Sequence, residues 1–277
     1  MILPKVRQNV AAVAAHYDEL DPFYREIWGE HVHHGYWRTG HETPEVATEA
    51  LIDLLVERLD LAPGQEIVDI GCGYGATAGR LARQFGVQVT GFTVSAAQAV
   101  MARGRDGVEV FCQDWLENRL ESERFDRAYA IESSEHMPDK QRFFAEAFRT
   151  LKPGGLLVMA VWLAGDRPAA WEVRHLLEPI CREGRLPSMG NGADYDAMAV
   201  TAGFSVLEQK DISAQVRKTW WICLRRVAVR LLTTPRYLRF LLDQRAQNRV
   251  FLLTLPRLIL AYRTGAMRYS VRVYRRD

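Results

Sequence analysis

The chain has 277 residues, of which 48% are apolar or aromatic, and its net charge at pH 7 is only +2. This size and composition argue against a disordered chain and are typical of one large globular domain. The longest apolar runs are interrupted, so none reaches the roughly 20 residues that span a bilayer, and the N-terminus shows no apolar signal segment. We therefore expect a cytoplasmic protein.

Two helices are predicted ahead of the first strand. Residues 5–20 have a helical pattern and lead into WGEHVHHGYW, residues 28–37, which combines three histidines with three Trp or Tyr rings. In the second helix, Thr43 takes the N-cap position and Pro44 the first helical position, and apolar residues recur at helical spacing up to Leu59. The aromatic and histidine-rich stretch thus connects two helices.

From residue 66 onward, strand-like and helix-like segments alternate. Strands are predicted over 66–70, 87–92, 108–114, 125–133 and 154–163, and helices over 74–85, 95–105 and 138–151. Alternation of this kind, with nearly continuous apolar strands, predicts an α/β fold with a doubly wound, mostly parallel sheet covered on both faces. Two late strands, 204–213 and 267–277, bring the total to seven and predict an antiparallel pair at the sheet edge with a helical insert between them.

The first strand ends in a glycine-rich loop, VDIGCGYGATA, residues 68–78. Gly71, Gly73 and Gly75 let the chain turn tightly and bring its backbone against a ligand, and the next helix offers free N–H groups. Taken alone, the loop could bind a dinucleotide or an S-adenosyl cofactor. The G-x-G-x-G spacing with Asp69 ahead of it favours the second, since dinucleotide loops read G-x-G-x-x-G.

This loop resembles the DxGxGxG loop of class I S-adenosylmethionine-dependent methyltransferases, and QDW (113–115) and LKPGG (151–155) resemble two later motifs of that family. The resemblance implies a Rossmann-like methyltransferase fold and S-adenosyl-L-methionine as cofactor. The run TVSAAQ, residues 93–98, resembles the TLSxxQ of cyclopropane-fatty-acid synthases and tocopherol-type methyltransferases. Thr93 stands where many members have an acid, and its hydroxyl would pair with a ribose hydroxyl more weakly than a carboxylate does.

Two further stretches extend the resemblance over about residues 15–210. IESSEHMPDK, residues 131–140, is similar to the ESGEHMPDK of γ-tocopherol methyltransferases, and WGEHVHHGYW is similar to their WGDHMHHGFY. This implies a single methyltransferase domain over 1–277. It would consist of an N-terminal helical lid (1–43), a cofactor-binding core (44–163) and a substrate-side cap (164–277) with a basic helical insert at about 215–263.

The resemblance also implies the site residues. The cofactor-binding candidates are Tyr17, His34, Tyr36, Asp69, Gly71, Cys72, Gly73, Gly75, Thr93, Val94, Ser95, Gln98, Asp114, Trp115 and Glu132. We expect the substrate chamber to be walled by Tyr24, Trp28, His33, Trp162, Trp171, His175 and Trp220. In the family that this chain resembles, the N-terminal segment folds over the methionine end of the cofactor, so the histidine-rich stretch is interpreted as a lid. His34 and Tyr36 would then reach the carboxylate or ammonium of the cofactor.

His136 is the predicted catalytic base, with Glu135 or Glu132 as its partner, because histidine exchanges protons near neutral pH. Alternative roles are a cofactor contact for Glu132 and an N-terminal contact to the following helix for His136. No metal is expected: His31, His33 and His34 have no second ligand cluster, and the four cysteines, Cys72, Cys112, Cys181 and Cys223, form no CxxC pair.

Residues 217–263 carry eleven Lys or Arg and one acid, Asp243, so the other residues of this +2 chain sum to −8. Three roles remain open for this segment: peripheral contact with a membrane, binding of an anionic substrate, or a cap with a solvated face or homodimer contact. Nucleic acid is not an expected partner, since no recognised binding module accompanies the charge.

The predicted function is methyl transfer to a small, lipophilic acceptor, with C-methylation of a phenolic or prenylated compound as in tocopherol-type enzymes. Alternatives with the same machinery are O- or N-methylation of a natural product and C-methylation of a prenyl diphosphate. A non-catalytic protein that binds an S-adenosyl ligand would have a damaged glycine loop or strand-4 motif, and both are intact here.

Overall fold

A computed structural model describes residues 1–246, 248 and 254–277. Within these residues one seven-stranded sheet has the order β3-β2-β1-β4-β5-β7-β6. The strands are β1 (Glu66–Ile70), β2 (Gln88–Thr93), β3 (Val108–Cys112), β4 (Phe125–Ile131), β5 (Leu151–Ala164), β6 (Phe204–Asp211) and β7 (Met267–Arg276). β1 to β5 are parallel, and β7 runs antiparallel between β5 and β6. The predicted α/β fold with a mostly parallel sheet is confirmed, and the late antiparallel pair is β6–β7.

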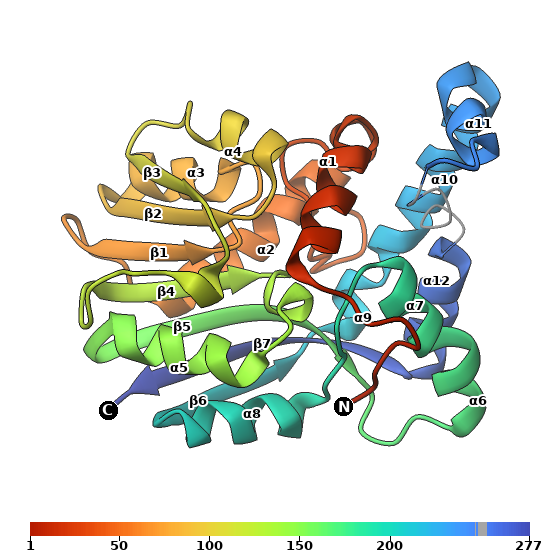
Figure 1. Ribbon diagram of the computed structural model, residues 1–277. Helices are drawn as coiled ribbons and strands as arrows, with labels where there is room; N and C mark the ends of the chain where they lie inside the picture. Colours follow the sequence, from red (N-terminus) through yellow and green to blue (C-terminus); the bar gives the residue numbers. More distant parts are fainter. Residues whose placement is uncertain (247, 249–253) are drawn as a thin grey trace.

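Helices surround this sheet on both faces (Figure 1). In chain order they are α1 (Val10–Ile27), α2 (Pro44–Leu59), α3 (Ala76–Phe85), α4 (Ala96–Ala102), α5 (Lys140–Thr150), α6 (Ala170–Glu172), α7 (Glu178–Glu183), α8 (Gly192–Thr201), α9 (Ser213–Val216), α10 (Lys218–Thr233), α11 (Pro235–Leu242) and α12 (Leu255–Thr264). Three short 3₁₀ or π turns complete the description, namely η1 (Trp115–Glu117), η2 (Ser134–His136) and η3 (Val173–Leu177).

The first helix differs from the prediction of residues 5–20. It begins at Val10, where the Asn9 side chain accepts a hydrogen bond from the Ala12 N–H at 2.8 Å, and it continues through Pro22 to Ile27. A proline inside a helix removes one backbone hydrogen bond. The helix nevertheless continues because its apolar face is buried on both sides of the proline, at Leu20 before it and at Tyr24 and Ile27 after it.

Two hydrophobic cores lie on opposite faces of the sheet. On one face, Phe143 and Phe144 of α5 pack with Tyr195 of α8. On the other face, the leucines of α2 pack with buried residues of α3, α7, α10 and α12. Between the two cores, β1 pairs in parallel with β2 and β4, so the carboxyl ends of these strands lie at one edge of the sheet, where ligands bind in open α/β sheets.

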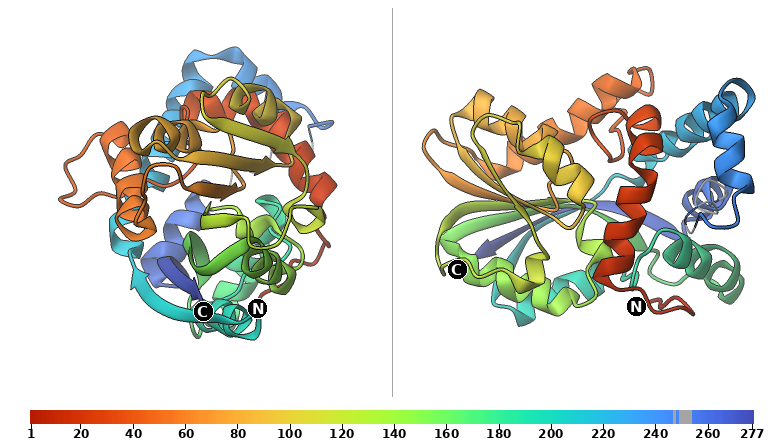
Figure 2. Two further views of the ribbon diagram at one scale, coloured as in Figure 1. Left: turned by 90° about the vertical axis from the view of Figure 1, so that its left-hand side faces the viewer. Right: turned by 45° about the horizontal axis from the view of Figure 1, so that its top comes forward.

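Helix α1 crosses the end of the sheet, while α10 and α11 extend away from it (Figures 1 and 2). The Tyr74 hydroxyl in the glycine loop donates to the Asp21 carboxylate of α1 at 2.7 Å. Among the described residues, no helix combines the length and the apolar character needed to cross a membrane. Residues 1–43, the predicted lid, contain α1 and the segment that follows it, and α1 lies next to the carboxyl edge of the sheet.

Candidate active site

A cavity with an empty volume of about 970 Å³, including its open mouth, lies at the carboxyl ends of β1, β2 and β4. Open α/β sheets bind their ligands at this position. Most of the predicted cofactor-binding residues line it, namely Tyr17, Asp69, Gly71, Cys72, Gly73, Thr93, Val94, Gln98, Asp114, Trp115 and Glu132. The structure thus brings to one wall side chains that are far apart in the sequence.

The three loop glycines are needed for different reasons. Gly71 has φ +93°, and a Cβ there would overlap the side chain of Ser133, which follows β4. Gly75 has φ +70° at the N-cap of α3, where a Cβ would lie 2.9 Å from the Cβ of Ala102 in α4. Gly73 has φ +52° and no heavy atom within 4 Å of an added Cβ, because it faces the cavity. Gly75 thus contributes to packing and does not line the cavity.

Asp69, the last residue but one of β1, has a carboxyl group that is almost fully buried. It accepts a hydrogen bond from the Tyr129 hydroxyl of β4 at 2.7 Å. Burial raises the pKa of Asp69 to about 7, against the lowering effect of this hydrogen bond. A cationic ligand in the cavity would therefore favour the charged form of this carboxyl group.

At the end of β2, the Thr93 hydroxyl donates to the Gln98 side-chain oxygen at 2.8 Å, and both side chains line the cavity. Ser95 has another role. Its hydroxyl accepts from the Gln98 N–H as the N-cap of α4 and donates to the Asp18 carboxylate of α1 at 2.5 Å. Ser95 is fully buried and lies outside the cavity wall, so it connects α1 to the site instead of facing a ligand.

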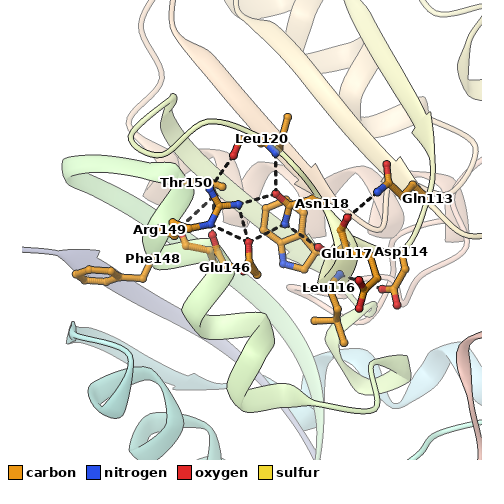
Figure 3. Close-up of polar contacts among 12 residues, drawn as sticks. Gln113, Asp114, Leu116, Glu117, Asn118, Leu120, Glu146, Phe148, Arg149 and Thr150 are labelled. Carbon is orange, nitrogen blue, oxygen red and sulfur yellow. Dashed lines mark hydrogen bonds and ion pairs between the residues drawn. The ribbon is translucent and has the colours of Figure 1, made fainter.

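The loop after β3 is held from outside the cavity (Figure 3). Asp114 accepts from the Leu116 N–H at 3.0 Å, and the Trp115 carbonyl accepts from the Asn118 amide at 2.7 Å. The Asn118 side chain in turn bonds to Glu146 at 3.0 Å and Arg149 at 2.8 Å, both in α5. The sequence analysis missed this support. The one feature of the sequence that could have indicated these contacts is Asn118, three residues after the QDW motif.

Glu132 follows β4 in a left-handed conformation, φ +52°. Its carboxylate accepts hydrogen bonds from the His34 N–H at 2.6 Å, His34 Nδ1 at 3.0 Å, Trp162 Nε1 at 2.6 Å and the Tyr269 hydroxyl at 2.7 Å. Burial alone would raise the pKa of Glu132, but the His34 contacts outweigh it and lower the pKa to about 2. Through these four hydrogen bonds the Glu132 carboxylate connects the segment after α1 to β5 and β7. With a pKa of about 2 it is a poor proton acceptor.

The lid presents His33 to the cavity instead of His34 or Tyr36. The His33 Nδ1–H donates to the His34 carbonyl at 2.9 Å, while the buried His33 Nε2 has no hydrogen-bond partner among the described residues. Burial lowers the pKa of His33 to about 4. His34 is directed to Glu132 and to the Tyr262 hydroxyl at 3.4 Å, and Tyr36 lies outside the cavity wall. His33 thus stands where the sequence analysis placed His34 and Tyr36.

His136 lies in the cavity wall at the end of η2. Its Nε2 is 3.0 Å from the Tyr17 hydroxyl of α1. Burial lowers the pKa of His136 to about 4, although the backbone of Arg185 opposes this shift. The imidazole is therefore neutral at pH 7.

Glu135 does not form the predicted pair with His136. It accepts from the Trp162 N–H at 2.6 Å and from the Ser134 hydroxyl at 3.1 Å, and burial raises its pKa to about 7. Glu132 is likewise engaged elsewhere. Among the described residues, the side-chain partner of His136 is Tyr17, a residue that the sequence analysis had placed with the cofactor.

The predicted substrate wall is only partly at the cavity. Trp162 and Trp220 pack edge to face at 5.4 Å between ring centroids, and Trp28 lies 6.1 Å from Trp220, so these rings form a packed cluster. The Tyr24 hydroxyl is 2.8 Å from His16 Nε2. Of the seven residues predicted for this wall, His33 lines the cavity.

Trp171 and His175 lie on the surface, since α6 and η3 follow a loop that leaves β5 outward. Trp171 is 49% exposed. The apolar part of the cavity wall comes instead from α1 and from the turn after β4, through Val10, Val13, Met137 and Pro138.

The cavity fits the implied cofactor. His33 Nε2 and Trp115 Nε1 are buried in its wall without a hydrogen-bond partner among the described residues, so each is available to a bound ligand. Gly73 leaves room for a close approach to its backbone. In the described part of the chain, no three His, Cys, Asp or Glu side chains are grouped to hold a metal ion.

Comparison with known proteins agrees with this assignment. The family model described as mycolic acid cyclopropane synthetase matches residues 4–231. Methyltransferase GfsG of Streptomyces halstedii is 33% identical over 75% of this chain and 77% of its own length. The tocopherol O-methyltransferase of Arabidopsis thaliana is 28% identical over 94% of this chain and 80% of its own length.

A solved structure gives the same fold. The cyclopropane synthase MmaA2 from Mycobacterium tuberculosis superposes with a TM-score of 0.84 at 22% identity and covers 98% of this chain and 99% of its own. The expected family, reaction class and cofactor are thereby confirmed. This chain belongs to the mycolic acid cyclopropane synthetase family and is an S-adenosylmethionine-dependent methyltransferase.

Proposed function

We propose that this methyltransferase acts on a small, lipophilic acceptor, and that it methylates a ring carbon of a phenolic or prenylated compound. Two relatives of Arabidopsis thaliana named for lipophilic acceptors support the acceptor class: the tocopherol O-methyltransferase, and a 24-methylenesterol C-methyltransferase that is 30% identical over 74% of this chain and 61% of its own length. O- or N-methylation of a natural product remains the alternative, since a 27-O-demethylrifamycin SV methyltransferase of Amycolatopsis mediterranei is 33% identical over 74% of this chain.

The neutral imidazole of His136 beside the Tyr17 hydroxyl is the observation that carries the proposal. The bound cofactor supplies an electrophilic methyl group on a sulfonium. The chain must hold the acceptor in line with that group and exclude water. A phenol becomes nucleophilic at oxygen and at ring carbons as it loses its proton, and a neutral histidine in the wall can take that proton. Val13 and Met137 provide apolar surface close by.

The charge of the cavity favours an acceptor without phosphate. None of the described residues that line it is Lys or Arg, whereas Glu30, Asp69, Asp114 and Glu132 do line it. Acidic groups stabilise a cationic cofactor and oppose an anionic acceptor. The arginines of the basic insert lie outside this cavity, and Arg225, Arg226 and Arg230 line an adjoining one that shares Glu30, His31 and His33 with it, so the prenyl diphosphate alternative would place the phosphates there.

The same insert supports peripheral contact with a membrane. Its helices α10 and α11 expose the large apolar side chains Trp221, Val229, Leu232, Leu238 and Leu242. Exposed arginines alternate with them, namely Arg225, Arg230, Arg236 and Arg239. Apolar side chains among arginines on a protruding helix pair suit an anionic lipid surface, from which a lipophilic acceptor could enter.

Vesicle binding tests this contact. Wild type should sediment with phosphatidylglycerol vesicles and much less with phosphatidylcholine vesicles. Leu232→Glu should reduce sedimentation, whereas Leu207→Glu on β6, also an exposed leucine, should not. If sedimentation is absent and gel filtration gives a dimer that Leu232→Glu dissociates, this face is a homodimer contact instead.

Methyl transfer from labelled cofactor to a panel of acceptors tests the proposed function. The panel would contain prenylated phenols, simple phenols, amines and prenyl diphosphates. We expect label on a phenol ring carbon, and a roughly 100-fold or greater fall in kcat in His136→Gln with cofactor binding retained. Label only on amines or diphosphates would contradict the proposed acceptor, and full activity of His136→Gln would contradict the proposed base.

A further inference from the structure

We propose that Lys140 is a positioning residue that holds His136 at the cavity by binding the two backbone carbonyls on either side of it. The inference rests on the proposed role of His136 as proton acceptor. It concerns a side chain that lies outside the cavity wall and has no part in the mechanism described so far.

Lys140 is the first residue of α5 and is only 2% exposed. Its Nζ lies 3.1 Å from the Glu135 carbonyl, 3.1 Å from the Met137 carbonyl and 3.0 Å from the Ser188 hydroxyl. An ammonium has three N–H donors, and each finds one acceptor here. A buried lysine needs this complete set because burying a charged group without partners is costly. The arrangement is therefore specific to a protonated lysine.

Side chains hold the first part of the turn that carries His136, since Glu135 bonds to the Trp162 N–H and Ser134 to Tyr195, but neither contact reaches His136 or Met137. η2 spans three residues, with backbone hydrogen bonds from His136 N to Ser133 O at 3.1 Å and from Met137 N to Ser134 O at 3.2 Å. Pro138 follows and has no N–H to contribute. Since the Glu135 and Met137 carbonyls both accept from one ammonium, the peptide group before His136 and the one after Met137 are fixed, and His136 lies between them. The imidazole can then keep its 3.0 Å contact with Tyr17.

The charge of Lys140 also acts on His136. The ammonium is close enough to lower the pKa of His136, which keeps the imidazole neutral. Burial lowers the pKa of Lys140 itself to about 8, and the nearby Glu135 and Cys181 oppose this shift. Below about pH 8 the ammonium keeps three donors. Above that pH it becomes an amine with two, and one of the three contacts is lost.

The decisive variant is Lys140→Met, with Lys152→Met as the matched control. Lys152 lies just beyond the other end of α5 and pairs with Asp126 in a partly exposed contact. We expect kcat of Lys140→Met to fall roughly 100-fold, as for a misplaced catalytic group, with the KM for the cofactor within about twofold of wild type. The acidic limb of the kcat profile should move to higher pH, and the wild-type decline above about pH 8 should disappear. Lys152→Met should match wild type.

A second readout separates this inference from the proposed function. The imidazole ¹H–¹³C resonance of His136, assigned by its loss in His136→Gln, should shift in Lys140→Met and stay in place in Lys152→Met. If the wild type binds cofactor but methylates no acceptor, the proposed function fails, while this resonance still tests the position of His136.

Two results would overturn the inference. One is an unchanged resonance with kcat within threefold of wild type. The other is an equal loss of thermal stability, cofactor affinity and kcat, as expected of a residue that only supports the fold. If Lys140→Met does not fold, Ser188→Ala removes a single acceptor instead. It should lower kcat several-fold and move the alkaline limb to lower pH, and an unchanged profile would contradict the proposal.

Discussion

The two halves of the sheet differ in how their site residues are determined. In the parallel half, β3-β2-β1-β4, the residues at the cavity lie at or just beyond the end of a strand: Gly71 follows β1, Thr93 ends β2 and Asp114 lies two residues after β3. In the other half, β5-β7-β6, the side chains nearest the site are directed by partners far away in the sequence. Trp162, for example, bonds to Glu132. Backbone geometry therefore specifies the predicted cofactor wall, whereas packing specifies the positions of the residues predicted for the acceptor.

Gly71→Ala should give the largest effect, because the loop after β1 needs a residue without a Cβ at this position. The new Cβ would overlap Ser133 and impose a side chain at φ +93°. We expect cofactor affinity, measured by calorimetry, to fall by more than roughly 100-fold, equivalent to about 3 kcal/mol. Gly64→Ala is the control, since Gly64 has φ +82° with no atom near an added Cβ. It should lose only about 1–2 kcal/mol of stability, from backbone strain alone, and an equal loss of affinity in both variants would refute the steric explanation.

Glu132→Gln should give the next largest effect, because Glu132 joins the two halves and the lid. Its carboxylate, with the side chain 6% exposed, accepts from the lid, β5 and β7. An amide can accept at one atom only and would present N–H groups to donors. We expect the free energy of unfolding to fall by about 2–3 kcal/mol, read out by denaturant unfolding.

The pH dependence of that loss gives a second check on Glu132. Because the pKa of Glu132 is lowered to about 2 in the folded protein, its contribution is fully present above the unfolded pKa, near 4.5, and is lost as the pH falls toward 2. The stability difference between wild type and Glu132→Gln should therefore shrink over this range. A constant difference would contradict the assignment of Glu132 as an ionised acceptor.

The sequence analysis succeeded where a motif needs a particular backbone shape. The alternation of strand-like and helix-like segments predicted the sheet, and the glycine loop with the later motifs predicted most of the residues that line the cavity. It failed where neighbours in sequence compete for one position. His33, His34 and Tyr36 alternate in direction, and only the bonds of His34 to Glu132 and Tyr262 leave His33 for the cavity. Pairing of Glu135 with Trp162 was equally invisible, because the two meet only through the register of β4 and β5.

Asn118→Ala should have a smaller effect, because it weakens the contacts that hold the loop after β3 against α5, on the side away from the cavity. It removes the bonds that join the Trp115 carbonyl to Glu146 and Arg149 of α5 (Figure 3). Losing one net hydrogen bond costs about 1 kcal/mol, so cofactor affinity should fall roughly fivefold, with kcat at saturating cofactor unchanged. Gln113→Ala, which removes a bond to the Glu117 carbonyl in the same loop, is the comparison. A fall in kcat with unchanged affinity would place Asn118 on the acceptor side instead.

Trp171→Ala should have the smallest effect, and it tests most directly the half of the molecule built on β5, β7 and β6. The sequence analysis placed Trp171 in the acceptor wall, but α6 carries it to the surface with 49% of its area exposed. We expect the KM for the acceptor and kcat to stay within twofold of wild type, as for surface substitutions in general. Trp162→Phe, which deletes the N–H that binds Glu132, should change both. A raised KM for the acceptor in Trp171→Ala would mean that α6 closes over the acceptor during the reaction. The packing around β5, β7 and β6 would then depend on the bound substrate as well as on the chain.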